Sequence, residues 1–316
     1  MRKLIKSSKN IDEAYNSVSR GLHNPQRHFF KNNIDVLKNC FRDYDTKALS
    51  GQLASLTPIW TDADVGIYSR EINGITTDVC YKHNEVAFKL YGSSRLYITE
   101  LWQELELLNS TTGSQKEEII CPICELTYCK HMDHHAPRAV SMFPEYSSHY
   151  SNLIPLCEEC NELKSDNWVY EDNGVKKRIW FNPYFDTLPD FDFFITDIII
   201  EMDMPMSIIN INPVLNRSID IHNIILCTID KLNLLKRYQD ALNIELKSFN
   251  EREIQSYYLN KTRYLDEEDF YQSMSDRVRE LIEIGKRQTI IEIMLYKSIL
   301  RSCIYKDWII NELKKY

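Results

Sequence analysis

The chain has 316 residues, and its 38 Lys and Arg against 46 Asp and Glu give a formal net charge of −8 at pH 7. Because proteins grip phosphate with clustered Lys and Arg, this balance argues against a protein that binds nucleic acid unaided. Only 8 residues are glycine, whereas average usage is roughly 7%; the scarcity disfavours tight hairpin turns and P-loop, Rossmann, β-sandwich and propeller folds, and favours helices joined by polar loops.

The first 118 residues are predicted to form a mainly helical region. Asn24 and Pro25 have the pattern of a capping residue followed by a proline at the first helical position. Apolar residues then repeat at helical spacing, at Phe30, Ile34, Leu37 and Phe41. Residues 51–80 are predicted to be irregular, with a short hairpin at residues 72–74. Helical pattern returns from about Glu85, with one stripe at Tyr97, Leu101 and Leu105.

Five of the nine cysteines fall within a forty-residue window, and four of them form two C-x₂-C pairs separated by 32 residues. Each pair suits a turn from which two thiolates converge, and two such pairs complete a tetrahedral Zn²⁺ site. The four predicted ligands are Cys121, Cys124, Cys157 and Cys160. Four thiolates leave no open position for water, so this zinc is expected to be structural. A redox pair is the alternative to zinc. Cys129 is either a packed side chain or a rival ligand, and His131 is a second rival ligand.

Polar residues of a second kind lie between and after the two cysteine pairs, in the order Asp133, His134, Asn152 and Asn161. An acidic-His pair, an Asn in a turn and an Asn on a helix, held between C-x₂-C pairs, resemble the zinc-stapled members of the HNH nuclease family. The resemblance covers about 48 residues, from Cys121 to Trp168, and implies a ββα-metal fold.

The resemblance implies metal-dependent hydrolysis of phosphodiester bonds in DNA, leaving 5′-phosphate and 3′-hydroxyl ends. His134 is the expected general base, because a pKa near 6.5 lets histidine take a proton from water at neutral pH. Asp133 and Asn161 are expected to hold one divalent ion, Mg²⁺ or Mn²⁺, through hard oxygen ligands. Asn152 is expected to pin the loop behind the base through amide hydrogen bonds.

Three neighbouring residues are expected to contact substrate. Lys164 from the helix and Arg138 from the loop are placed to reach phosphate. His135, next to the base, is either an assistant at the metal or phosphate or a simple strand residue. RNA remains an alternative substrate.

A looser resemblance concerns the whole protein. Pro137 and the run from Phe143 to Tyr146, with Tyr184 and Asp186 downstream, resemble stand-alone bacterial HNH proteins such as the nuclease subunit of Septu-type anti-phage systems. That resemblance implies bacterial defence and an ATPase partner, and it gives the first alternative: a nuclease subunit inactive alone and activated by the ATPase. The second alternative is a non-catalytic zinc module that binds nucleic acid or protein.

Residues 183–316 are predicted to be mainly helical, with a long final helix marked by Ile293, Leu300, Ile304 and Trp308. Residues 180–216 carry six acidic side chains and no basic one, so this segment is not expected to follow a phosphate backbone.

Charge is also uneven elsewhere: Cys121 to Trp168 has 3 basic and 7 acidic residues, whereas residues 1–38 have 8 basic and 3 acidic. The N-terminal stretch is the best local candidate for a DNA-backbone surface, with an ordinary solvated helix face as the alternative. The catalytic segment is expected to bind DNA weakly by itself.

We therefore predict a mainly α protein with a small embedded α+β module. Its three parts are a helical region at 1–118, an HNH ββα-metal module with a four-cysteine zinc site at 119–182 and a helical region at 183–316. No apolar targeting segment or run of 18 uncharged apolar residues occurs, so a cytoplasmic protein without membrane contact is expected. The cysteines are then not expected to form disulfides.

Overall fold

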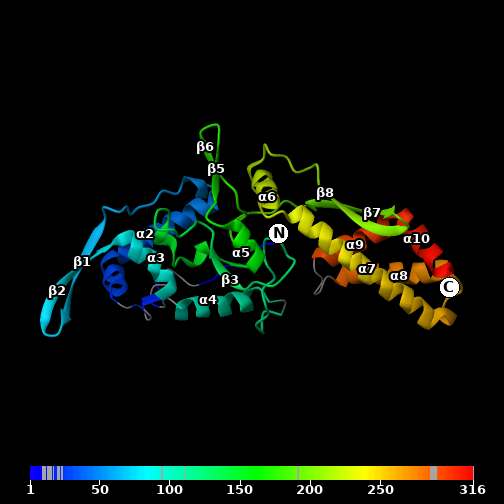
Figure 1. Cartoon of the computed structure of the whole chain (residues 1–316), viewed down its shortest axis with the longest axis horizontal. Helices are drawn as coiled ribbons and strands as arrows, with labels where there is room; N and C mark the ends of the chain where they lie inside the picture. The colour runs from blue at the N-terminus through cyan, green and yellow to red at the C-terminus, as the bar shows by residue number, and fades with distance from the viewer. Residues whose placement is uncertain are drawn as a thin grey trace. The chain divides into compact units, whose positions relative to one another are not determined.

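The chain folds into two compact units, Met1–Leu188 and Pro189–Tyr316. The computed structural model describes residues 1–8, 12, 16, 18–19, 22, 24–93, 95–110, 112–190, 192–284 and 290–315. About half of the described residues are helical, and strands form two-stranded antiparallel sheets (Figure 1), in agreement with a mainly helical class. The boundary predicted after residue 118 lies inside the first unit, and the one after residue 182 lies a few residues before the division.

The first unit begins with helices and one long hairpin. Helix α2 (Gln26–Leu49) buries an apolar face made of Phe29, Phe30, Leu37, Cys40, Phe41, Tyr44 and Ala48. The hairpin has strands β1 (Val65–Ile72) and β2 (Ile75–Lys82) and leads directly into α3 (His83–Ser93), which is followed by α4 (Arg95–Leu108). The predicted hairpin turn is confirmed, but its strands are longer than the sequence pattern indicated. Because most of their side chains are exposed on both faces, the sequence lacks the apolar pattern of a half-buried strand there.

The cysteine-rich segment forms a second, smaller arrangement in the same unit. Strand β3 (His131–His134) pairs antiparallel with β4 (Leu153–Leu156), with His134 opposite Leu153. Helix α5 (Glu158–Lys164) follows β4. Short 3-10 turns at Pro144–Tyr146 and Tyr150–Asn152 shape the connection between the strands. A further hairpin, β5 (Val169–Asp172) and β6 (Val175–Arg178), comes after α5.

The second unit pairs a hairpin with helices. Strands β7 (Phe194–Glu201) and β8 (Met204–Ile211) precede the helices α6 (Asp220–Lys231), α7 (Leu234–Asn260), α8 (Glu267–Ile284), α9 (Ile290–Arg301) and α10 (Cys303–Lys314). The outer backbone edge of β8 is satisfied by amide side chains of α7. Asn243 Oδ1 accepts from the Ser207 N–H at 2.9 Å, and Gln239 Oε1 accepts from the Ile209 N–H at 3.0 Å. These bonds block an edge that could otherwise pair with another strand.

Two sequence predictions for this unit need correction. The single long final helix is wrong: α9 ends at Arg301, and the Ser302 hydroxyl accepts from the Tyr305 N–H, which caps the start of α10. The β7–β8 hairpin lies in a segment for which no strand was predicted.

Scarce glycine did not prevent tight hairpins. Two-residue turns with positive φ at both positions form at Asn73-Gly74, Asn173-Gly174 and Met202-Asp203. The third turn uses no glycine, so composition gave no sign of it. Among the described helices, none has the length and apolar character needed to cross a membrane.

Candidate metal and catalytic site

The four predicted cysteine ligands converge in the first unit. The Sγ atoms of Cys121, Cys124, Cys157 and Cys160 all lie within 4.8 Å of one another, and every one of these side chains is buried. The Sγ atoms of Cys124 and Cys157 are 3.7 Å apart, close to the separation of about 3.8 Å that tetrahedral Zn–S bonds of about 2.3 Å require. This cluster can therefore hold a metal ion such as zinc. Cys129 is buried nearby but lies outside the group, as does the exposed His131.

Local backbone geometry explains why the cysteines meet. The Cys121 N–H donates to Thr127 O at 2.8 Å, and Glu125, in the left-handed region with φ of 53°, donates its N–H to Cys121 O. This tight turn brings the first pair together. Cys157 is the N-cap residue of α5, and its carbonyl accepts from the Asn161 N–H at 3.0 Å. Cys157 therefore belongs both to the cysteine cluster and to the start of the helix that carries Asn161.

A pocket of about 430 Å³ lies beside the cluster, and three of the four predicted catalytic residues line it. Asp133 and His134 come from β3, and Asn161 comes from α5. The remaining lining residues are Tyr91, Ile98, Trp102, Lys130, His131, Met132 and Arg138. The pocket therefore has one wall of polar groups and another formed by α3 and α4.

His134 is held in one protonation form by its surroundings. Its side chain is buried, and Nε2 lies 2.8 Å from the backbone oxygen of Ser147. Because a carbonyl oxygen only accepts, Nε2 carries the proton and Nδ1 keeps a lone pair in the neutral ring. Burial lowers the pKa of His134 to about 4, against the opposing effects of Ser147 and Asp133. The imidazole is thus neutral at pH 7, the form that can accept a proton.

Lys164 is bound to oxygens of its own chain. Its Nζ lies 2.9 Å from Asp133 Oδ2 and donates to the backbone oxygen of His134 at 2.7 Å. The side chain is only 4% exposed. A direct contact with an incoming phosphate, as the sequence suggested, is not available to a lysine held in this way; instead the ammonium holds the carboxylate of Asp133.

Arg138 reaches the pocket while packing on α3. Its guanidinium lies 4.5 Å from the ring centre of Phe88 and 4.8 Å from that of Tyr91, and Nη1 donates to Phe88 O at 3.1 Å. The side chain lines the pocket and is half-buried, so the guanidinium lies where a phosphate in the pocket could meet it.

Asn152 lies behind β3, fully buried, and bridges two loop segments. Its Oδ1 accepts from the Ala136 N–H at 2.7 Å, and its Nδ2 donates to Ala136 O at 3.0 Å and Tyr146 O at 3.3 Å. These bonds tie the residues after His134 to the turn before Ser147.

His135 is not in a position to touch substrate, which corrects the sequence expectation. The ring is fully buried outside the pocket lining, and its Nε2 lies 3.2 Å from Trp180 O. Burial holds the pKa of His135 well below the usual value.

The sequence did not identify the residues contributed from outside the cysteine-rich segment. Within the segment it also missed Ser147, whose backbone oxygen lies 2.8 Å from His134 Nε2. From outside it, Tyr91, Ile98 and Trp102 line the pocket from α3 and α4. None of these positions belongs to a recognisable motif, and their distance from Asp133 along the chain gave no signal of contact.

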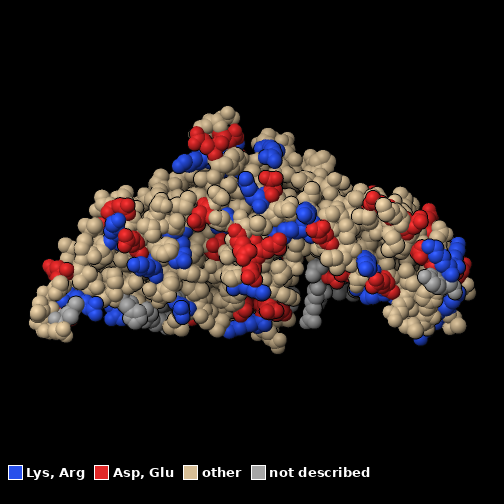
Figure 2. All heavy atoms as spheres, in the orientation of Figure 1, with Lys and Arg blue, Asp and Glu red and all other residues tan. Residues whose placement is uncertain are grey.

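Charge of both signs lies on the one face that Figure 2 shows. Lys and Arg side chains are interspersed with Asp and Glu over the face shown in Figure 2, rather than gathered into one extended basic surface. At the basic N-terminal stretch, Lys6 lies 3.8 Å from Asp45, while Lys9 and Arg20 fall outside the described residues.

Comparison with protein-family models, curated proteins and solved structures finds no match to this chain.

Proposed function

We propose that this chain is a metal-dependent endonuclease of the HNH type that hydrolyses phosphodiester bonds of DNA. The observation that carries the proposal is the shared pocket of Asp133, His134 and Asn161, on a strand pair and helix joined to a four-cysteine cluster. The β3–β4–α5 order has the succession of a ββα-metal core.

His134 is the general base of the proposed reaction. With its proton on Nε2, the ring presents the Nδ1 lone pair to a water molecule and takes a proton from it as the oxygen attacks phosphorus. The hydrogen bond to Ser147 O stabilises the imidazolium that forms, because a carbonyl dipole faces the charged ring.

Asp133 and Asn161 would hold the divalent ion, Mg²⁺ or Mn²⁺, since a carboxylate and an amide oxygen line one pocket. When bound, such an ion neutralises charge on the phosphate and on the leaving oxygen. Lys164 fixes the direction of the Asp133 carboxylate through its 2.9 Å contact. Arg138 contacts the phosphate from the pocket wall.

The excess of acidic over basic residues between Cys121 and Trp168 supports weak intrinsic DNA binding and dependence on a partner. From the looser resemblance to the nuclease subunit of Septu-type systems, we propose that the nuclease acts in bacterial anti-phage defence, with an ATPase subunit that delivers DNA or switches the site on. The alternative is a non-catalytic zinc module. It differs from the nuclease active alone and from the partner-activated nuclease in one testable respect: only in the two nucleases does a His134 substitution abolish an activity.

A plasmid-nicking assay with Mg²⁺ or Mn²⁺ tests the proposal. Wild type is expected to nick, and His134→Ala and Asp133→Asn to lose at least about a hundredfold in rate. Asp172→Asn is the matched control, because Asp172 is partly exposed on the β5–β6 hairpin, outside the pocket lining, where it pairs with Lys177. Nicks that DNA ligase reseals show 5′-phosphate and 3′-hydroxyl ends.

Equal activity of wild type and His134→Ala would contradict the mechanism. Nicking that appears only when an ATPase partner is added would establish the partner-dependent form. Absence of nicking under both conditions would favour the non-catalytic zinc module.

A further inference from the structure

We propose that helix α3, which lies outside the cysteine-rich segment, holds the base in place, and that Tyr91 is its positioning residue. The effect of Tyr91 on catalysis rests on the proposed nuclease function of His134. The way in which Tyr91 holds the imidazole does not depend on that function.

Tyr91 contacts strand β3 at two points. Its hydroxyl donates to the backbone oxygen of Met132 at 2.9 Å. Its ring meets the His134 ring edge to face, with centres 4.7 Å apart and planes at 70°. The first contact fixes the strand two residues before the base, and the second restricts rotation of the imidazole itself.

The same helix also supports the other side of the base. The hydroxyl of Ser147 donates to Ala87 O at 2.5 Å, and the carbonyl of the same serine accepts from His134 Nε2. Ala87 and Tyr91 are four residues apart, so they lie on one face of α3. One helix therefore contacts the His134 ring through Tyr91 and holds the partner of its Nε2 atom through Ala87.

Arg138 adds a third connection between α3 and the loop after the base. Its guanidinium donates to Phe88 O and lies against the Tyr91 ring. Phe88 follows Ala87 on α3, and thus three positions within five residues of one helix hold the segment between Met132 and Ser147.

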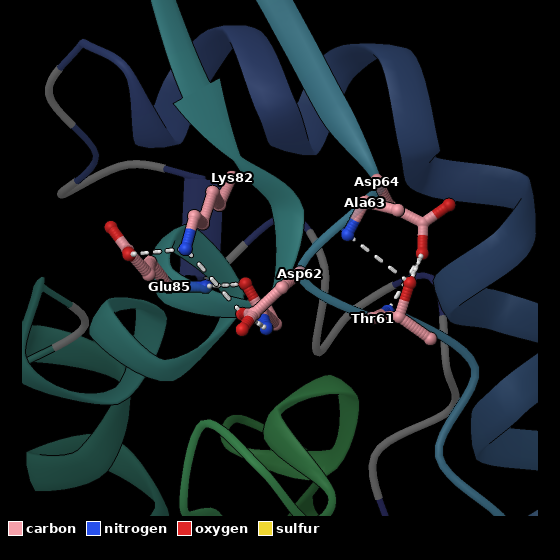
Figure 3. A network of polar contacts seen from close by, with 7 residues as sticks. Thr61, Asp62, Ala63, Asp64, Lys82 and Glu85 are labelled. Atoms are coloured by element: carbon pink, nitrogen blue, oxygen red, sulfur yellow. Dashed lines mark hydrogen bonds and ion pairs between the residues drawn. The ribbon is translucent and has the colours of Figure 1, made fainter.

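The start of α3 is itself fixed by a polar network at the base of the β1–β2 hairpin. Figure 3 shows Lys82 between the carboxylates of Asp62 and Glu85, at 3.6 and 3.7 Å. Asn84 Nδ2 also donates to Asp62 Oδ1 at 2.9 Å. The helix is thereby tied at its first turn, and Tyr91, near its end, lines the pocket.

Two variants separate the two contacts of Tyr91. Tyr91→Phe removes the bond to Met132 O and keeps the ring, whereas Tyr91→Leu removes both. Tyr97→Phe is the matched control, because Tyr97 is fully buried on α4 and its hydroxyl has no hydrogen-bond partner in the described chain.

The first measurement needs no nuclease activity. Long-range ¹H–¹⁵N spectra of the ¹⁵N-histidine-labelled full chain report the tautomer of each imidazole, and His134→Gln identifies the His134 signals. Wild type and Tyr97→Phe are expected to show a single Nε2–H tautomer at His134. Tyr91→Leu is expected to show a mixture of tautomers or broadened signals.

The second measurement is the split between kcat and KM in nicking. Tyr91→Leu is expected to lower kcat between about tenfold and a hundredfold, the range for a slightly misplaced reacting group, with KM nearly unchanged. Tyr91→Phe is expected to retain most of the activity that Tyr91→Leu loses, because the ring contact remains.

Wild-type His134 signals and wild-type kcat in Tyr91→Leu, with only a lower melting temperature, would overturn the inference and leave Tyr91 a packing residue. If wild type shows no nuclease activity under any condition, the proposed function fails on its own. The His134 spectra of folded Tyr91→Phe and Tyr91→Leu then decide the positioning role: an unchanged tautomer in both overturns it.

Discussion

The four cysteine ligands and the predicted catalytic residues Asp133, His134 and Asn161 come from one short stretch of chain, but the metal cluster and the pocket depend on the rest of the molecule to different degrees. The cluster uses four identical ligands brought together by two local turns. The pocket combines unlike groups from β3 and α5, and its opposite wall and the support of His134 come from α3 and α4. Local spacing is therefore sufficient for the metal cluster, whereas the pocket requires tertiary packing.

The largest effect is expected where the cluster is broken. Cys121→Ser removes one of four ligands, and because metal binding and folding are one process in small metal-stapled segments, worth about 10 kcal/mol or more in zinc-finger peptides, the first unit is expected to lose its cooperative unfolding. Metal content and thermal unfolding followed by circular dichroism measure this.

Cys303→Ser is the matched control, since Cys303 is exposed at the start of α10 in the second unit. Full metal content and an unchanged melting temperature in Cys121→Ser would show that the cluster holds no ion that matters to the fold.

A smaller effect is expected from the loop that carries Ser147. Glu145 is fully buried, with one oxygen near the Ile59 N–H and the other without a partner in the described chain. Burial raises its pKa from 4.5 to about 7. The folded chain therefore keeps a proton that the unfolded chain releases from about pH 4.5, and the free energy of unfolding falls as pH rises from 4.5 to 7.

Glu145→Gln removes this dependence. Wild type and variant are expected to be similarly stable at pH 5, and the variant is expected to be more stable at pH 8 by up to about 3 kcal/mol. Urea unfolding at both pH values gives the difference. A constant gap between the two proteins across this range would mean that the carboxyl is not titrating in the window.

The smallest effect concerns the ion pair at the rim of the pocket. Lys164→Met leaves the partly exposed Asp133 without its 2.9 Å partner, and the unfolding free energy is expected to fall by about 1 to 3 kcal/mol. Lys130→Met is the comparison, because its 3.7 Å pair with Glu158 is exposed on both sides and is worth at most about 1 kcal/mol. Equal losses in the two variants would remove the distinction between the buried Lys164 and the exposed Lys130.

The features predicted from sequence are those encoded by neighbours along the chain. The C-x₂-C spacing located the four ligands, and Asn73-Gly74 located the hairpin turn. The break at Ser302 was missed because the apolar pattern runs through it, although the serine precedes Tyr305 at capping distance.

What could not be predicted depends on contacts between distant segments. Tyr91 is an ordinary aromatic residue on an amphipathic helix until α3 packs on β3. The burial of Lys164 and His135 also follows only from packing. The sequence therefore suggested substrate contacts for two side chains that the fold buries.

The β7–β8 hairpin has a consequence for the order in which the second unit is completed. Its turn residue Asp203 receives a hydrogen bond from the indole of Trp308 on α10, 105 residues later, and Thr196 on β7 donates to Met294 O on α9, 98 residues later. A ribosome that has released the hairpin must add about a hundred residues before these partners emerge. Until then the hairpin is bonded to α7 through Gln239 and Asn243 but lacks its partners on α9 and α10, and a two-stranded sheet with few partners is marginally stable in water. The second unit therefore completes its packing only after α9 and α10 have been made, and the stage before that is the one at which chaperone binding or misassembly is favoured.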